Sequence, residues 1–203
     1  MFDARLRRLL DPSLTRGAMV LDRTWITPGR LTATGLILGL GSAVAAGVGW
    51  WAISAALWLV SRLADGLDGP LARLRTARGH RDSGAGGFLD ITADFTVYGA
   101  TVVGVAIGAG GAQWPFLLVL LAYYVNGAAF LAFSSIAERS GRTIDDGRSL
   151  SFLGGLAEGA ETIVVHTLWL VLPFWAPQIA VVWAAVVGIS GAHRIVAGYR
   201  ALR

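Results

Sequence analysis

Four aspartates interrupt two otherwise apolar segments of this chain: Asp65 and Asp68 in one, and Asp90 and Asp94 in the next. A carboxylate at the centre of a membrane helix costs about 2.5–3.5 kcal/mol on insertion scales and commonly marks a functional site. Spacings of three and four residues place each pair on one face of a helix. Because hard oxygen ligands select magnesium, manganese or calcium, the four carboxylates predict a divalent-metal site.

The two segments are expected to form antiparallel helices joined by a loop centred near Gly79. Each aspartate pair lies at a similar number of residues from that centre, so all four carboxylates can share one depth. Four anionic groups at close range cannot all ionise without compensation. Two divalent cations would balance them, which suits phosphoryl transfer. The alternative is structural, with aspartates paired to Arg62 or Arg73 only to lock helices together.

The composition indicates an all-α integral membrane protein. The chain has 203 residues, 55% of them hydrophobic, which is too apolar for an ordinary soluble domain. Cysteine is absent, which excludes disulfides, thiolate zinc sites and a cysteine nucleophile. About 20 apolar residues cross a bilayer. On that basis six transmembrane helices are predicted, at 28–49, 51–74, 86–110, 114–137, 150–173 and 176–202.

The arginines predict the orientation. The connections at 47–51, 108–114 and 173–178 carry no charge, whereas 73–82 and 137–150 are rich in arginine. The positive-inside rule then places both termini, both charged loops and the active site on the cytoplasmic side of the cytoplasmic membrane. The basic residues lie between apolar segments rather than in a soluble patch, so nucleic acid is not a predicted partner.

Residues 1–24 are predicted to form a cytoplasmic amphipathic and juxtamembrane segment, and residues 25–203 the six-helix transmembrane domain. A short interfacial helix would lie on the anionic leaflet and contact membrane lipids. Its expected apolar face consists of Phe2, Leu6, Leu9 and Leu10. Asp11-Pro12 is expected to end this helix and to allow another turn to begin. Thr27-Pro28 is expected to cap and open the first span.

A fixed order of residue types runs from position 65 to position 94: Asp-x2-Asp-Gly-x2-Ala-Arg, a spacer, and Gly-x3-Asp-x3-Asp. The residues are Asp65, Asp68, Gly69, Ala72, Arg73, Gly86, Asp90 and Asp94. This pattern resembles the CDP-alcohol phosphotransferase family, also called CDP-alcohol phosphatidyltransferases, which are integral membrane enzymes of phospholipid synthesis. The spacer at 74–85 is longer than is usual in the family. The extra residues fall in the loop, where length is tolerated.

The resemblance implies an enzyme that transfers a phosphatidyl group from a CDP-linked lipid, usually CDP-diacylglycerol, to an alcohol, with release of CMP. It implies two divalent ions, Mg²⁺ or Mn²⁺, bound by the four aspartates. Asp94 would be both a ligand and the base that deprotonates the acceptor hydroxyl. Cytidine diphosphate would be contacted by Gly69, Ala72, Arg73 and Gly86. The resemblance also implies a homodimer.

The acceptor pocket is expected among the charged residues of the last two spans, namely Arg148, Glu158, Glu161 and Arg194. Arginines would favour a phosphorylated polyol, whereas glutamates would favour hydroxyls or an amine. These indications conflict, so the acceptor alcohol stays open. For the nearby His166, an interhelical hydrogen bond is expected in preference to a substrate role.

Two other functions are compatible with the aspartates. An ion-coupled transporter would use them as a cation pathway, but it would need polar residues continuing across the membrane. The segments 101–109 and 114–121 are almost purely apolar, which counts against such a path. A non-catalytic scaffold would not need the intact motif.

Overall fold

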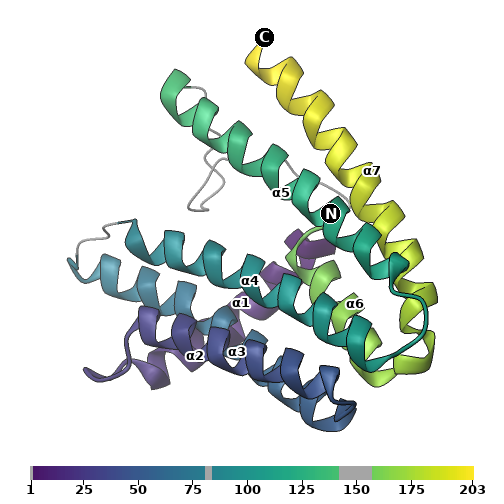
Figure 1. Ribbon diagram of the computed structural model, residues 1–203. Coiled ribbons are helices and arrows are strands. Elements are labelled where there is room, and N and C mark those ends of the chain that lie inside the picture. The colour runs from purple at the N-terminus through teal and green to yellow at the C-terminus, as the bar shows by residue number, and fades with distance from the viewer. Residues whose placement is uncertain (1, 81–83, 142–156) are drawn as a thin grey trace.

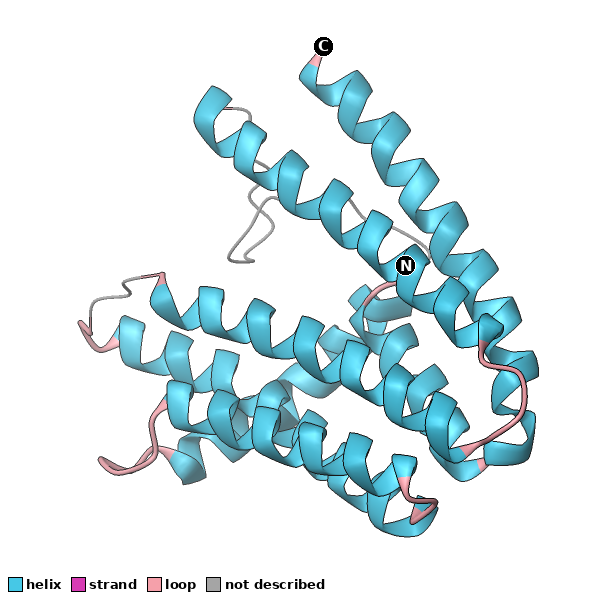
Figure 2. Cartoon of the chain, viewed as in Figure 1, coloured by secondary structure: helices cyan, strands magenta, loops and turns pink. Residues whose placement is uncertain are grey.

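The computed structural model describes residues 2–80, 84–141 and 157–203, with side chains from residue 9 onward. Within these ranges the regular structure is helical (Figure 2). The helices are α1 (Phe2–Leu21), α2 (Pro28–Gly47), α3 (Trp51–Ala77), α4 (Ala85–Gly108), α5 (Trp114–Ser140), α6 (Gly159–Val171) and α7 (Ala176–Leu202), with a 3₁₀ turn at Pro173–Trp175. The all-α prediction is confirmed for the described residues, and each of the six predicted spans overlaps one of the helices α2–α7.

Among the described residues, four segments are long and apolar enough to cross a membrane: α2, α4, α5, and Pro173–Leu202 with α7. The helix α3 is as long as α5, but Arg62, Asp65 and Asp68 interrupt its apolar sequence. The helix α6 has only 13 residues. The chain is therefore a membrane protein with four candidate spans, and the six-span layout stays a prediction.

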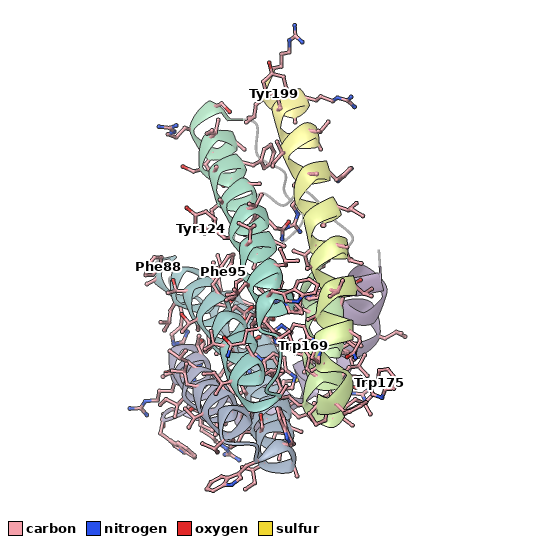
Figure 3. The ribbon with its side chains drawn as sticks, turned by 45° about the vertical axis from the view of Figure 1, so that its right-hand side comes forward. Phe88, Phe95, Tyr124, Trp169, Trp175 and Tyr199 are labelled. Atoms are coloured by element: carbon pink, nitrogen blue, oxygen red, sulfur yellow. The ribbon has the colours of Figure 1, made fainter. Side chains whose placement is uncertain are left out.

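The helices form two groups (Figure 1). The helix α2 packs against α3 and α4, and α1 lies against α3. The helices α5 and α7 run side by side and extend away from the α2–α4 group. The connections α2–α3, α4–α5 and α6–α7 lie toward one end of the molecule, and the C-terminal end of α3 and the start of α4 lie toward the other. Trp175 and Tyr199 lie at opposite ends of α7 (Figure 3).

An aromatic cluster links α3 to α5, α6 and α7. The His166 ring stacks on Trp58 with ring centroids 5.0 Å apart. The Nε2 atom of His166 lies 2.9 Å from the hydroxyl of Tyr123, and that hydroxyl also accepts a 2.7 Å hydrogen bond from Trp183 Nε1. The interhelical hydrogen bond expected for His166 is confirmed. This cluster fixes the side of α3 that faces α6.

The N-terminal helix differs from its prediction. The helix α1 does not end at Asp11-Pro12 but continues through Pro12 to Leu21. Its second half packs on α3: Ala18 is buried, and Gly17 lies against the side chain of Leu67. This packing outweighs the backbone hydrogen bond that a proline removes.

The described side chains do not decide whether α1 is amphipathic. Phe2 and Leu6 fall outside the residues whose side chains are described, and Leu9 and Leu10 are exposed. The interfacial placement of α1 therefore stays a prediction. The predicted cap of α2 is confirmed, because Thr27 Oγ1 accepts a 3.2 Å hydrogen bond from the backbone N–H of Arg30.

Hydrogen bonds from Arg75 and Arg78, here called the clasp, hold the α1–α2 connection against the C-terminal end of α3. The carboxylate of Asp22 accepts hydrogen bonds from Arg75 Nε, at 3.2 Å, and from Arg78 Nη1. Arg75 Nη2 also donates to the backbone carbonyls of Arg23 and Ile26, at 2.9 and 2.7 Å. The hydrogen bond from Arg75, together with Arg78, holds the pKa of Asp22 below its usual value.

We expect the clasp to weaken in acid. Because the pKa of Asp22 is lowered in the folded protein, its stabilising effect is present above the ordinary carboxyl pKa and is lost as pH falls through the lowered value. Asp22→Asn should lower the melting temperature in detergent at neutral pH, and the difference from wild type should shrink in acid. The control is Glu138→Gln on an exposed turn of α5. A difference that does not change with pH would contradict the clasp.

Close packing of α2 on α4 depends on two glycines. A Cβ atom at Gly104 would overlap the backbone carbonyl of Ala43, and one at Gly108 would overlap that of Ala46. Small residues allow such close approach of helix backbones in membranes. Because the neighbouring atoms are backbone, they cannot move aside as a flexible side chain would.

Gly104→Ala should therefore destabilise the protein by about 1–3 kcal/mol, the usual range for overpacking. The measurement is thermal or denaturant unfolding in detergent micelles. Gly99→Ala is the matched control on the same helix, since a Cβ atom there meets nothing within 4 Å. Equal stability of the two variants would show that α2 and α4 do not pack this closely.

Candidate metal centre

Three of the four predicted aspartates meet between α3 and α4. Asp65 and Asp68 from α3 and Asp90 from α4 each offer a carboxylate oxygen, and these oxygens lie within 4.8 Å of one another. Asp68 is buried, and the other two are half-buried. The shared depth predicted from the helix register is confirmed for these three residues. Their all-oxygen donor set fits a hard divalent cation.

Thr32 on α2 orients one of these carboxylates. Its hydroxyl donates a 2.5 Å hydrogen bond to Asp68 Oδ2, and both residues are buried. This bond occupies one oxygen of Asp68 and ties a third helix to the cluster. The sequence analysis did not identify Thr32. A threonine in the second turn of an apolar span, near the charged end, was the available signal.

Asp94 is not part of this group of three among the described residues. Its Oδ1 atom instead accepts a 2.6 Å hydrogen bond from Arg62 Nη1. The same nitrogen lies 3.6 Å from Asp65 Oδ2. The two sequence hypotheses, a metal cluster and a helix-locking Asp–Arg pair, therefore both describe part of this site. Arg73, the other arginine considered for such a pair, contacts Asp11 on α1 at 3.4 Å, and both side chains are exposed.

Arg62 lies in an aromatic setting that the sequence analysis did not anticipate. Its guanidinium carbon is 5.1 Å from the ring centre of Trp58 and 5.2 Å from that of Tyr98. Such distances are within the range of cation–π attraction. Arg62 Nη2 also donates a 3.0 Å hydrogen bond to Ser61 Oγ. The guanidinium is thus held by two neighbouring aromatic rings and by hydrogen bonds at its polar edge.

The residues expected to contact a nucleotide lie toward the loop end of the α3–α4 hairpin. Gly69, Ala72 and Arg73 follow Asp68 along α3, and Gly86 is in the first turn of α4. Gly86 is exposed, and a Cβ atom there would meet nothing within 4 Å. The Arg73 side chain is 63% exposed. These residues border the carboxylates at the accessible end of the hairpin.

Three of the four expected acceptor residues lie in the described part of the chain. Arg194 on α7 is buried and donates a 3.1 Å hydrogen bond to Asn126 on α5. Glu158 is buried at the start of α6, and Glu161 follows in its first turn. One carboxylate oxygen of Glu161 is buried without a hydrogen-bond partner among the described residues. Arg148 lies outside the described residues.

Two solved structures share this fold. Both are of phosphatidylinositol phosphate synthase PgsA1 from Mycobacterium tuberculosis. The one with CDP-DAG bound gives a TM-score of 0.70 at 22% identity, covering 92% of this chain and 93% of that one. The one in complex with manganese and citrate gives a TM-score of 0.71 at 24% identity, covering 92% of this chain and 88% of that one. At these identities the likeness concerns the fold alone.

Sequence comparison identifies the family. The inner membrane protein YnjF of Escherichia coli is 34% identical over 214 aligned residues, covering 100% of this chain and 98% of that protein. The family model for CDP-alcohol phosphatidyltransferases matches residues 25–190, a range that contains the three clustered aspartates and Asp94. The chain therefore belongs to the CDP-alcohol phosphatidyltransferase family.

Proposed function

We propose that this protein transfers a phosphatidyl group from CDP-diacylglycerol to an alcohol acceptor and releases CMP. The observation that carries the proposal is the convergence of Asp65, Asp68 and Asp90 within 4.8 Å in a chain of this family. The same fold binds CDP-DAG in one mycobacterial structure and manganese in another, which supports the assignment by analogy.

Asp65, Asp68 and Asp90 would hold Mg²⁺ or Mn²⁺, and Asp94 would complete a site for two ions. When bound, divalent ions neutralise the diphosphate of the donor and stabilise charge on the oxygens around phosphorus. The protein contributes the position of these carboxylates, which α3 and α4 supply from rigid helical backbone. Thr32 holds Asp68 in a fixed orientation through its 2.5 Å hydrogen bond.

Asp94 is the proposed general base. It would take the proton from the acceptor hydroxyl while the new oxygen–phosphorus bond forms and the bond to CMP breaks. Its side chain is 29% exposed, so it is not sealed inside the protein. The cytidine diphosphate would be bound by Gly69, Ala72, Arg73 and Gly86, which lie at the accessible end of the hairpin.

The identity of the acceptor depends on which charged residues face it. Arg148 and Arg194 would bind an anionic acceptor such as a phosphorylated polyol. Glu158 and Glu161 would bind a neutral polyol or an amine. Since Arg194 already donates to Asn126, its role in such a pocket would be shared with that amide. A panel of alcohols from these three classes decides between them.

The proposed setting is a six-helix membrane domain at 25–203, preceded by an interfacial segment at 1–24 and assembled as a homodimer. Both termini and the active site would face the cytoplasm. The separation of uncharged connections from the charged α3–α4 connection at opposite ends of the molecule supports this orientation (Figure 1).

The transporter alternative is less well supported. Beyond the aspartates, the buried side chains of α4 toward its uncharged end are Thr101, Val102 and Val105, and the Thr101 hydroxyl donates to the Val97 carbonyl of its own helix. This stretch therefore has few free polar atoms that could coordinate a cation or its water molecules. Membership of a family named for phosphatidyl transfer also favours the enzyme.

The activity test measures CMP release from CDP-diacylglycerol by purified protein with Mg²⁺ or Mn²⁺ and the alcohol panel. Release should require both metal and acceptor. Asp68→Asn and Asp90→Asn should each lower turnover by at least about 10²–10³-fold, the range for removing one strong electrostatic contribution. Glu138→Gln, on the exposed end of α5, should keep wild-type turnover. Near wild-type activity of either aspartate variant would exclude the proposed metal site.

The orientation test uses the absence of cysteine from the chain, because any introduced thiol is then the only one. Arg78→Cys, after α3, should react with a membrane-impermeant maleimide only in inside-out vesicles. Gln113→Cys, which is exposed before α5, should react only in right-side-out vesicles. The reverse pattern would place the carboxylates on the outer side, away from a cytoplasmic nucleotide donor.

A further inference from the structure

Arg62 is a cation built into the carboxylate cluster, although the family pattern of aspartates, glycines, alanine and arginine does not include it. It lies one helical turn before Asp65 on α3, and its side chain is only 5% exposed. Its Nη1 atom donates to Asp94 Oδ1 at 2.6 Å and lies 3.6 Å from Asp65 Oδ2. A guanidinium stays protonated in proteins, so this positive charge is permanent.

The guanidinium is held from several sides, so it cannot easily leave. Trp58 and Tyr98 lie on it at 5.1 and 5.2 Å. Trp58 is itself fixed, because its Nε1 donates a 3.0 Å hydrogen bond to Thr167 on α6 and its ring stacks on His166. Moving Arg62 away would strip a buried charge of these contacts, which is strongly unfavourable.

The charges set how many metal ions the site can take. Arg62 neutralises one of the four carboxylates, so three negative charges remain. One divalent ion at Asp65, Asp68 and Asp90 leaves a single excess negative charge. A second divalent ion would leave the half-buried cluster positive, next to a fixed guanidinium. The diphosphate of a CDP-linked donor brings the negative charge that a second ion needs.

We propose that Arg62 is a positioning residue that keeps Asp94 out of the resting ligand set, so that one divalent ion binds alone and a second enters only with the diphosphate. This inference rests on the proposed function, because it takes the carboxylates to be the metal site. Asp94 has two oxygens, and Arg62 holds Oδ1. Arg62 therefore also fixes the orientation of the carboxylate proposed as the base.

The experiment counts Mn²⁺ bound per chain by equilibrium dialysis of the purified full-length protein, with and without cytidine diphosphate (CDP). Wild type should bind one Mn²⁺ alone and two with saturating CDP. Arg62→Gln should bind two Mn²⁺ without CDP, because Asp94 is released and the fixed charge is gone. Arg62→Lys keeps the charge and should bind one.

Two further variants keep the test decisive if Arg62→Gln does not fold. Asp94→Asn should still bind one Mn²⁺ without CDP, because Asp94 is not a resting ligand, although the uncompensated charge of Arg62 weakens that binding. With CDP it should fail to gain the second ion. Asp90→Asn is the comparison, since it removes a resting ligand and should weaken Mn²⁺ binding without CDP much more than Asp94→Asn does.

The outcomes separate this inference from the proposed function. Two Mn²⁺ on wild type without CDP, or one Mn²⁺ on folded Arg62→Gln, would overturn the role of Arg62 and leave phosphatidyl transfer intact. A resting affinity for Mn²⁺ that falls as far in Asp94→Asn as in Asp90→Asn would do the same. A wild-type ratio that stays at one with CDP would overturn the diphosphate-linked second ion. No bound Mn²⁺ on wild type under any condition would overturn both the inference and the proposed metal site.

Discussion

Arg62 donates a hydrogen bond to Asp94 across the α3–α4 hairpin, at a depth where the surrounding helices are largely apolar. Charges in such a place persist only when partners compensate them. The rest of the site follows from this requirement. The aromatic rings of Trp58 and Tyr98 support the cation, and Thr32 supports one of the anions. Three helices, α2, α3 and α4, must therefore keep a fixed spacing.

That spacing depends on small residues at the other end of the same helices. Gly104 and Gly108 bring the backbone of α4 against the carbonyls of Ala43 and Ala46 on α2. Nearer the carboxylates, Gly35 on α2 lies close to the backbone of Ser61 and Asp65 on α3. The close packing of the apolar half and the geometry of the polar half are thus one structural feature.

The sequence predicted the hairpin well, because the rise of a helix is constant. Counting residues from the loop was enough to place Asp65, Asp68 and Asp90 at one depth. The same count could not predict that Asp94 faces Arg62, because that depends on side-chain rotamers. Nor could it find Thr32, which comes from a different helix. The prediction that α1 ends at Pro12 was wrong, because a rule based on proline alone does not include the packing of α1 against α3.

The acceptor pocket stays a prediction, because Arg148 lies outside the described residues. Arg194 is buried, and its guanidinium donates a hydrogen bond to Asn126 on α5. A charge in a membrane helix can serve helix association as well as substrate binding. The aspartates differ from Arg194. Three of them converge from two helices to within 4.8 Å of one another, which increases the electrostatic repulsion between their carboxylates. A cation that binds the three carboxylates would compensate this repulsion, so the convergence of the aspartates is explained by a ligand, whereas the Arg194–Asn126 hydrogen bond forms without one.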